Sequence, residues 1–205
     1  MFEIAPHGYG TSQEVASLLP GSKDRRYALV KRAIAGGQLI HIRRGLYCLA
    51  PRYQRTKINL YALAGHIHGP SYISLESALS WHGWIPEAVY TLTSVSLGKF
   101  KEFRTPLGVF SYARVPQRIL YAGVDRRIDE AGDVFFMASP IKALADYVHV
   151  HRKDWVSLEP VFEDLRIDPE EMKTVSLDEI GLLLANYSST RVARFLRGVR
   201  KELGR

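Results

Sequence analysis

The sequence predicts a mixed α+β fold, with helices at both ends of the chain and strands in its middle. The segments "YTLTSVSL", "GVFSYARV" and "DVFFMA" have the β-branched and aromatic content of strands. Segments with apolar residues at helical spacing, and with capping residues at their ends, precede and follow these strands. A hydrophobic fraction of 46% over 205 residues is enough to bury a core, so we expect a globular protein.

Two short helices are predicted first. The segment "TSQEVASLLPG" begins with Thr11 and has Glu14 three residues later, which is the pattern of a capping box, and a Pro-Gly pair ends it. The segment "SKDRRYALVKRAIAGG" follows, with Ser22 as the N-cap and two glycines as the terminator. The chain therefore starts with two consecutive helices.

The second of these helices is predicted to have an apolar face and a basic face. With roughly 100° between successive residues, Tyr27, Val30 and Ile34 share one face. Nearly the opposite face carries Arg25, Ala28 and Arg32. The small alanine between two arginines would let this basic face approach another surface closely.

A two-stranded hairpin is predicted in "LIHIRRGLYCL", with its turn at Arg44 and Gly45. Gly45 supplies the positive φ that such a turn usually needs. Four apolar side chains would then share one face of the hairpin, with Ile42 paired to Tyr47 and Ile40 paired to Leu49. Arg43 and Arg44 lie at the tip, and this packing requires neither of them.

The charge of the chain is unevenly distributed. Residues 1–57 hold ten Lys or Arg against three acids, residues 58–187 hold 12 against 17, and residues 188–205 hold six against one. Two helices followed by a basic-tipped hairpin are typical of a compact winged helix-turn-helix, whose second helix enters the major groove of DNA. A basic region of this kind favours a polyanionic partner. The predicted DNA-binding residues are Lys23, Arg25, Arg26, Lys31, Arg32, Arg43 and Arg44.

We assign residues 1–55 to the winged helix-turn-helix and residues 56–205 to a larger α+β domain that is helical from about residue 139. Its helices are predicted in "KINLYALAGHIHGP", in "SLESALSWHGW" with Ser74 as the cap, and in "SPIKALADYVHV" with Ser139 as the cap. Four more begin near residues 157, 168, 176 and 189. The last of them could pack with its apolar face on the domain and leave its basic face in water. Alternatively, the basic residues Arg194, Arg197 and Lys201 could form a second surface for nucleic acid or a partner.

The motifs of common enzymes and metal sites do not occur. There is no phosphate-binding glycine loop or nucleophile elbow, and "GSKD" lacks the following Asp-x-Asp strand of nucleotidyltransferases. In the pairs His66 with His68 and His149 with His151, the two side chains would point in different directions on a helix. We therefore expect a protein without catalytic residues, metal or cofactor.

The composition also bears on the compartment. The single Cys48 cannot form an intrachain disulfide. Apolar runs are too short for a membrane span, and "MFEIAPHGYG" lacks the pattern of a signal peptide. We expect a cytoplasmic protein that does not bind membranes.

Three stretches resemble one known family, the AbiEi-type antitoxins. "LVKRAIAGGQLIHIRRGLYCLAP" resembles the family's winged-helix segment, "YISLESALSWHGWIPE" is similar to the opening of its second domain, and "FFMASPIKALADYV" is similar to its strand followed by a helix. The matches keep the family's order and run from about residue 26 to residue 150. The chain departs from the family's pattern in having only two predicted helices before the wing, and in residues 151–205.

The resemblance implies a transcriptional repressor in a type IV toxin-antitoxin system of phage defence. Such a repressor binds operator repeats in the double-stranded DNA of its own operon through the amino-terminal domain. It also implies a carboxy-terminal domain that counteracts a nucleotidyltransferase-like toxin, functionally and not necessarily by direct contact.

Other functions stay open from the sequence alone. The protein could be an antitoxin that acts chiefly through its carboxy-terminal domain without repressing transcription. It could also bind structured RNA, although the stacked aromatic platform of single-strand readers is not seen. Whether it acts on DNA as a monomer or as a homodimer is open as well.

Overall fold

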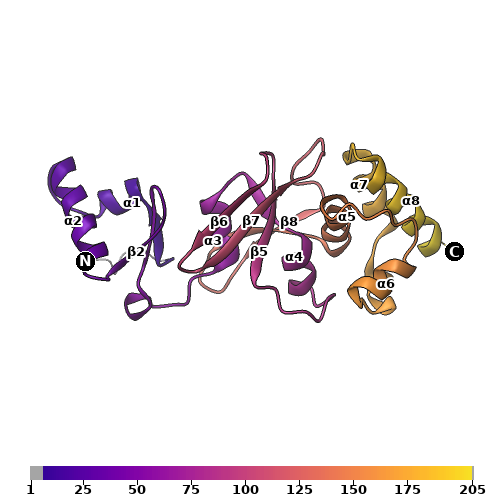
Figure 1. Ribbon diagram of the computed structural model, residues 1–205, viewed down its shortest axis with the longest axis horizontal. Helices are drawn as coiled ribbons and strands as arrows, with labels where there is room; N and C mark the ends of the chain where they lie inside the picture. The colour runs from indigo at the N-terminus through magenta and orange to yellow at the C-terminus, as the bar shows by residue number, and fades with distance from the viewer. Residues whose placement is uncertain (1–6, 205) are drawn as a thin grey trace.

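The computed structural model describes residues 7–204, which form two sheets with helices around them (Figure 1). The predicted mixed α+β fold is confirmed. The long axis of the molecule runs from the amino-terminal helices at one end to the last helices at the other. Residues 1–6, which belong to the stretch inspected for a targeting signal, and Arg205 lie outside the described residues.

The amino-terminal unit, residues 7–49, consists of two helices and a three-stranded antiparallel sheet. Its elements are β1 (Tyr9–Thr11), α1 (Ser12–Ser17), α2 (Lys23–Ala35), β2 (Leu39–Arg43) and β3 (Leu46–Leu49), and the strand order is β1-β3-β2. Both predicted helices are confirmed. Thr11 and Glu14 form the capping box, and the Ser22 hydroxyl accepts a hydrogen bond from the backbone N–H of Arg25 at 3.4 Å.

Helix α2 buries a different face from the predicted one. Ala33 is buried, and Leu29 and Val30 pack against the same small core. Tyr27 and Ile34 are instead 72% and 36% exposed. The prediction failed because this charged helix has few apolar residues, and they do not form one continuous stripe. The contacts with α1 and the small sheet therefore decide which side is buried.

The hairpin of β2 and β3 is confirmed, but its predicted register is wrong. Ile40 pairs with Cys48 instead of Leu49, and a bulge lies between His41 and Arg43. The side chains directed at the helices are Leu39, Tyr47 and Leu49, and those directed at the larger core are Ile42, Leu46 and Cys48. Because this sheet is covered on both faces, apolar residues occur on both, and no simple alternation marks the register.

The larger sheet has six strands in the order β6-β7-β5-β4-β9-β8. The strands are β4 (Ser71–Ile73), β5 (Thr91–Ser96), β6 (Lys101–Thr105), β7 (Gly108–Arg114), β8 (Val124–Ile128) and β9 (Val134–Ala138). The three predicted strands correspond to β5, β7 and β9. The sequence missed β6 and β8, which are charged edge strands, and β4, which is only three residues long.

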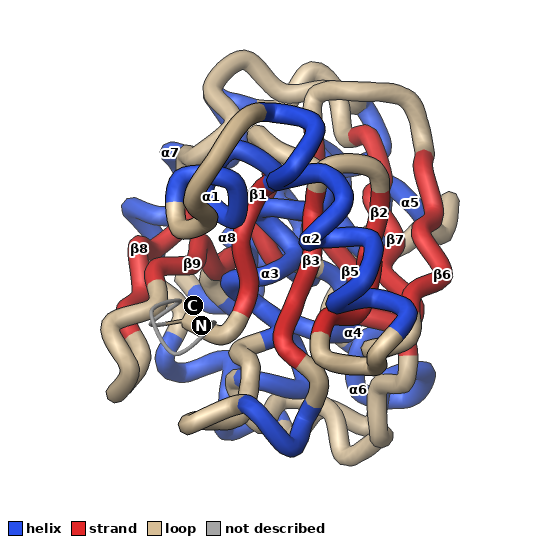
Figure 2. Tube along the Cα trace, turned by 90° about the vertical axis from the view of Figure 1, so that its left-hand side faces the viewer, coloured by secondary structure: helices blue, strands red, loops and turns tan. Residues whose placement is uncertain are grey.

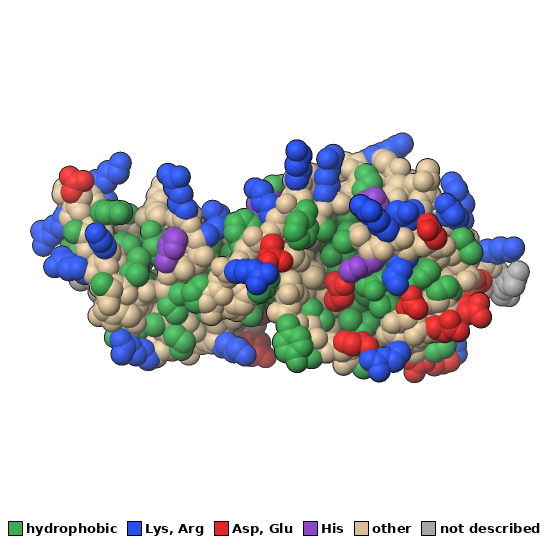
Figure 3. Space-filling view, in the orientation of Figure 1, with side chains coloured by type: hydrophobic (Ala, Val, Ile, Leu, Met, Phe, Trp, Pro, Cys, Tyr) green, Lys and Arg blue, Asp and Glu red, His purple; other side chains and the backbone are tan. Residues whose placement is uncertain are grey.

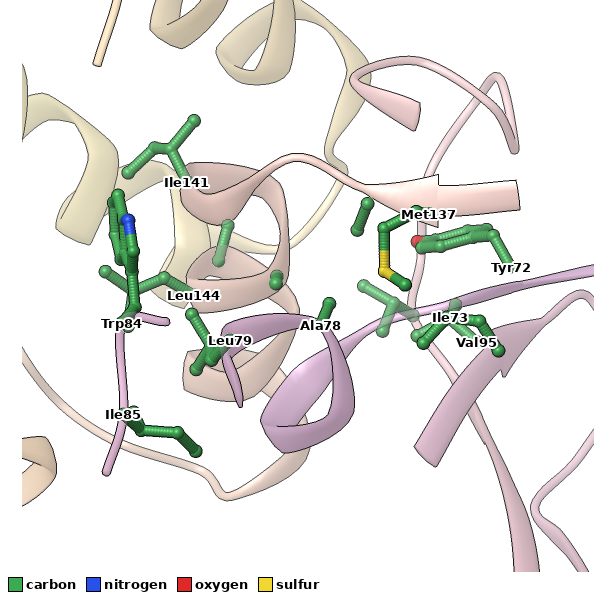
Figure 4. Close-up of a cluster of buried hydrophobic side chains, with 14 of the residues drawn as sticks. Tyr72, Ile73, Ala78, Leu79, Trp84, Ile85, Val95, Met137, Ile141 and Leu144 are labelled. Atoms are coloured by element: carbon green, nitrogen blue, oxygen red, sulfur yellow. The ribbon is translucent and has the colours of Figure 1, made fainter. Parts of the chain in front are cut away.

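Helices cover both faces of this sheet. Helix α3 (Leu60–Ile67) lies on the side of the amino-terminal unit, and α4 (Leu75–Trp81) and α5 (Pro140–Val150) lie on the opposite side (Figure 1). Apolar side chains of the strands meet those of α4 and α5 in the main core, including Ile73, Met137, Leu79 and Leu144 (Figure 4). All of them are at most 2% exposed.

The chain after α5 is built from helices. They are α6 (Glu159–Leu165), the 3₁₀ helix η2 (Pro169–Thr174), α7 (Leu177–Asn186) and α8 (Thr190–Leu203), which agree with the predicted starts. A further 3₁₀ helix, η1 (Pro51–Tyr53), lies in the link after the amino-terminal unit. Within residues 7–204 no helix is long and apolar enough to span a bilayer.

The two predicted serine caps of the second unit behave differently. The Ser139 hydroxyl accepts the backbone N–H of Lys142 at 3.2 Å, as expected for an N-cap. Ser74 occupies the N-cap position of α4 but its side chain makes no capping bond. Its hydroxyl donates to Asp146 Oδ2 at 2.7 Å instead, because a buried carboxylate is the stronger acceptor.

Candidate nucleic-acid interface

The outer face of α2 is the most exposed basic element of the amino-terminal unit. Lys23, Arg25, Lys31 and Arg32 are all exposed, and Ala28 between the two arginines is exposed with them. The predicted basic face therefore lies at the surface. Figure 3 shows Lys and Arg side chains at this end as well as over the rest of the face in view, whereas most of the acidic side chains in view lie over the other half.

Arg26, also a predicted DNA-binding residue, is placed differently. Its side chain is half-buried beside α1, and its Nε atom is buried without a hydrogen-bond partner among residues 7–204. A buried donor without a partner costs free energy, about 1 to 3 kcal/mol. This guanidinium is therefore not simply solvated like its neighbours on α2.

The two arginines at the hairpin tip have different surroundings. Arg44 is exposed at the turn, as predicted. Arg43 Nη2 donates to the backbone oxygen of His66 at 2.9 Å, and Nη1 donates to that of Arg44 at 3.3 Å. His66 lies in the last turn of α3, where a cation also interacts favourably with the helix dipole. The prediction that packing requires neither arginine is therefore wrong for Arg43.

Polar contacts hold the amino-terminal unit against the second unit, residues 58–204. The Tyr9 hydroxyl donates to Asp133 Oδ1 at 3.4 Å, and His7 pairs with the same carboxylate. Within the second unit, Asn59, just before α3, donates to Asp129 Oδ2 at 2.7 Å. Burial raises the pKa of Asp133, and the nearby His7 acts in the opposite direction. The two contacts with Asp133 therefore attach the start of the amino-terminal unit to the loop between β8 and β9.

The second predicted basic surface is remote from the first. Arg194, Arg197 and Lys201 are exposed on α8, opposite the buried Val192, Phe195, Leu196 and Val199. Helix α8 lies at the far end of the molecule from α2 (Figure 1). The structure therefore does not bring the two predicted basic surfaces together.

The paired histidines have separate partners. His149 Nδ1 lies 3.1 Å from the Ser189 hydroxyl, and His151 Nε2 lies 2.7 Å from Glu76 Oε1. Burial lowers the pKa of His68, and the cations Lys101 and Arg43 lower it further. In the part of the chain that the structure describes, no three His, Cys, Asp or Glu side chains are grouped as metal ligands would be.

A buried polar network in the second unit was not predicted. Lys142 and Asp146 are both completely buried, and they lie one turn apart on α5. Lys142 Nζ donates to Asp146 Oδ1 at 3.2 Å, to Gln117 Oε1 at 2.6 Å and to the Tyr187 hydroxyl at 2.7 Å. The signal was a Lys and an Asp four residues apart in a helix whose other residues are mostly apolar.

No protein-family model matches the chain, and a search of curated proteins found no match either. The functional argument therefore depends on the residues and their geometry. The feature with the clearest chemistry for a ligand is the basic outer face of α2, together with Arg44 on the neighbouring hairpin.

Proposed function

We propose that this protein is a DNA-binding transcriptional autorepressor and an antitoxin of a type IV toxin-antitoxin system. In this proposal the amino-terminal unit is a winged helix-turn-helix that binds operator repeats, and the second unit counteracts a nucleotidyltransferase-like toxin. The resemblance of three sequence stretches to the AbiEi-type antitoxins supports both parts. No catalytic role is assigned to the chain.

The observation that carries the DNA-binding part is the exposed basic face of α2. This helix has 13 residues and is therefore ~20 Å long, and the diameter of an α-helix, about 10 to 12 Å, suits the width of a major groove. Arg25 and Arg32 lie two turns apart and flank Ala28, so the backbone of α2 can approach the DNA closely while both guanidiniums reach phosphates or base edges.

The first prediction concerns these two arginines. Arg25→Ala combined with Arg32→Ala should weaken binding to duplexes from the region upstream of the gene by about 10- to 100-fold, because two charge-assisted contacts are lost. The slope of log K against log salt should also decrease by about 2. Fluorescence anisotropy titrations at several salt concentrations measure both quantities.

A matched control removes the same charge elsewhere. Arg194→Ala combined with Arg197→Ala on α8 lowers the net charge equally but leaves α2 intact. Its affinity and salt slope should stay within about twofold of the wild type, because these side chains lie at the other end of the molecule. Equal losses in the two double variants would show that only the overall charge attracts DNA and would contradict the assignment of α2.

The second prediction separates the two hairpin arginines. Arg44→Ala should lower DNA affinity about three- to tenfold without changing the thermal midpoint, because its side chain is exposed at the tip. Arg43→Ala should lower the free energy of unfolding by about 1 kcal/mol, because it removes the hydrogen bond to His66 at the end of α3. Thermal unfolding and anisotropy, measured on both variants, test this contrast. A destabilised Arg44→Ala protein would argue against it.

The alternative of an antitoxin without repression predicts that toxin neutralisation is independent of α2. The test uses the full chain, because Tyr9, Ile42, Leu46 and Cys48 share the larger core with the second unit. The Arg25→Ala plus Arg32→Ala variant is expressed from an unrelated promoter together with the neighbouring toxin gene. If the variant rescues cells from the toxin fully although it no longer binds DNA, neutralisation is a property of the second unit. If rescue is lost as well, neutralisation and DNA binding depend on each other.

A further inference from the structure

A hollow lies between α1, α2 and β3 on the outer side of the amino-terminal unit. Its volume is about 290 Å³, and its lining comprises Ser12, Ala16, Lys23, Asp24, Arg26, Tyr27, Val30 and Tyr47. Figure 2 looks onto this end of the molecule, with α1 and α2 lying across the small sheet. The backbone N–H of Ser12 donates to the Gly45 oxygen at 2.9 Å, so the hollow adjoins the turn of the hairpin.

Two tyrosines form walls of this hollow, Tyr27 from the predicted apolar face of α2 and Tyr47 from the predicted inner face of the hairpin. Tyr27 projects from α2 with 72% of its surface exposed, and Tyr47 on β3 is only half-buried. Their rings leave an amphipathic surface, with apolar faces and a hydroxyl at the end of each side chain. Tyr27 is not part of the small core of the unit, so core packing does not explain the position of this side chain.

The polar groups of the hollow are mostly donors. Lys23 and Arg26 bring positive charge, and Ser12 brings a hydroxyl. The Nε atom of Arg26 is buried without a partner among residues 7–204. Asp24 is the one acid among the described residues that line the hollow, so the two cations leave an excess of positive charge.

We infer that this hollow binds one phosphate of a DNA strand together with the adjoining deoxyribose. The inference rests on the proposed DNA-binding function and names a contact within it. Arg26, Lys23 and the Ser12 hydroxyl suit the phosphate oxygens, and the ring faces of Tyr27 and Tyr47 suit the apolar side of the sugar. The hollow lies on the flank of α2 that carries Tyr27 and Val30, so this contact is separate from those of Arg25 and Arg32 on the other flank.

The test is a scan with methylphosphonates, which remove the charge of one phosphate at a time. Duplexes that the wild type binds are prepared with a single neutral linkage at each position in turn. One position should weaken wild-type binding by about tenfold and weaken the Arg26→Gln variant by less than about threefold, because that variant has already lost the partner. Arg32→Gln, altered outside the hollow, should keep the full effect at that position.

A second variant distinguishes a phosphate from a base edge. Asp24→Asn keeps the shape of the side chain and removes its negative charge, so it should strengthen binding about two- to fivefold if a phosphate lies nearby. Weaker binding with altered base preference would instead show that Asp24 accepts a hydrogen bond from a base, and would overturn the inference.

The remaining outcomes separate this inference from the proposed function. Salt-dependent DNA binding without any position coupled to Arg26 would overturn the phosphate site and leave the role of α2 in place. Failure of the wild type to bind any duplex from its own upstream region would overturn both. Circular dichroism of each variant confirms that α1 and α2 are still folded when these affinities are compared.

Discussion

Lys142→Met is expected to lower the free energy of unfolding by about 3 to 5 kcal/mol. Lys142 and Asp146 are both fully buried, and the variant leaves the Asp146 carboxylate without its cation. A domain of this size is stable by only about 5 to 15 kcal/mol, so the loss is a large fraction of the total. Urea unfolding at neutral pH, followed by circular dichroism, gives the difference.

The network explains why this loss is large. Asp146 Oδ2 accepts hydrogen bonds from the Tyr72 hydroxyl at 2.8 Å and from Ser74 at 2.7 Å, and Oδ1 accepts one from the Tyr187 hydroxyl at 2.6 Å. Burial lowers the pKa of Lys142, and the adjacent Asp146 opposes that shift. The network joins β4, α5 and the segment after α7. Loss of these hydrogen bonds therefore weakens the attachment of α7 and α8 to the sheet.

Two further variants make this prediction specific. Lys173→Met removes an exposed lysine whose Nζ is 2.6 Å from Glu170 Oε1, and it should change the free energy of unfolding by less than about 1 kcal/mol. Adding Asp146→Asn to Lys142→Met removes the unpaired charge and should restore at least about 1 kcal/mol. A Lys142→Met protein as stable as Lys173→Met would contradict the role given to the buried pair.

Gly198→Ala is expected to destabilise the protein by about 3 kcal/mol or more, which is the upper end of the usual range for overpacking. A Cβ atom at this position would lie 2.7 Å from the carbonyl carbon of Val156 and would overlap the carbonyl oxygen. That neighbour is backbone, so no rotamer change relieves the contact. Helix α8 would have to move, which exposes Phe195 and Leu196. The midpoint of urea unfolding measures the effect.

The matched control is a glycine in the neighbouring helix. Gly181 lies inside α7, and a Cβ added there meets no heavy atom of the described chain within 4 Å. Gly181→Ala should therefore leave the fold unchanged and raise the free energy of unfolding by up to about 1 kcal/mol, because alanine favours helix over glycine. If Gly198→Ala stabilised the protein in the same way, the close approach of α8 to Val156 would be refuted.

Local features of the fold could be predicted because they depend on residues near each other in the chain. The capping box of Thr11 and Glu14, the cap at Ser22 and the turn at Gly45 each involve contacts within a few residues. The exposure of Arg25 and Arg32 was predicted for the same reason, since charged side chains on a short surface helix stay in water.

Contacts between distant segments could not be predicted. The second unit draws Ile42 and Leu46 into its core and thereby sets the register of the hairpin. Arg43 and Arg44 are identical neighbours in the sequence. Arg43, however, donates to the backbone oxygen of His66 in α3, which lies 23 positions later in the chain. The buried network likewise joins residues of four separate segments, which no periodic pattern reveals.

The sequence by itself therefore determined the helices, the hairpin and three strands of the larger sheet, most of the caps, and the basic character of α2 and α8. Only the tertiary structure decided which face of α2 is buried, that Tyr27 and Tyr47 border a hollow, and that Arg43 holds α3. The physical reason is the range of the interactions. Propensities, caps and charge act along a few residues, whereas burial and buried hydrogen bonds depend on surfaces brought together by the whole chain.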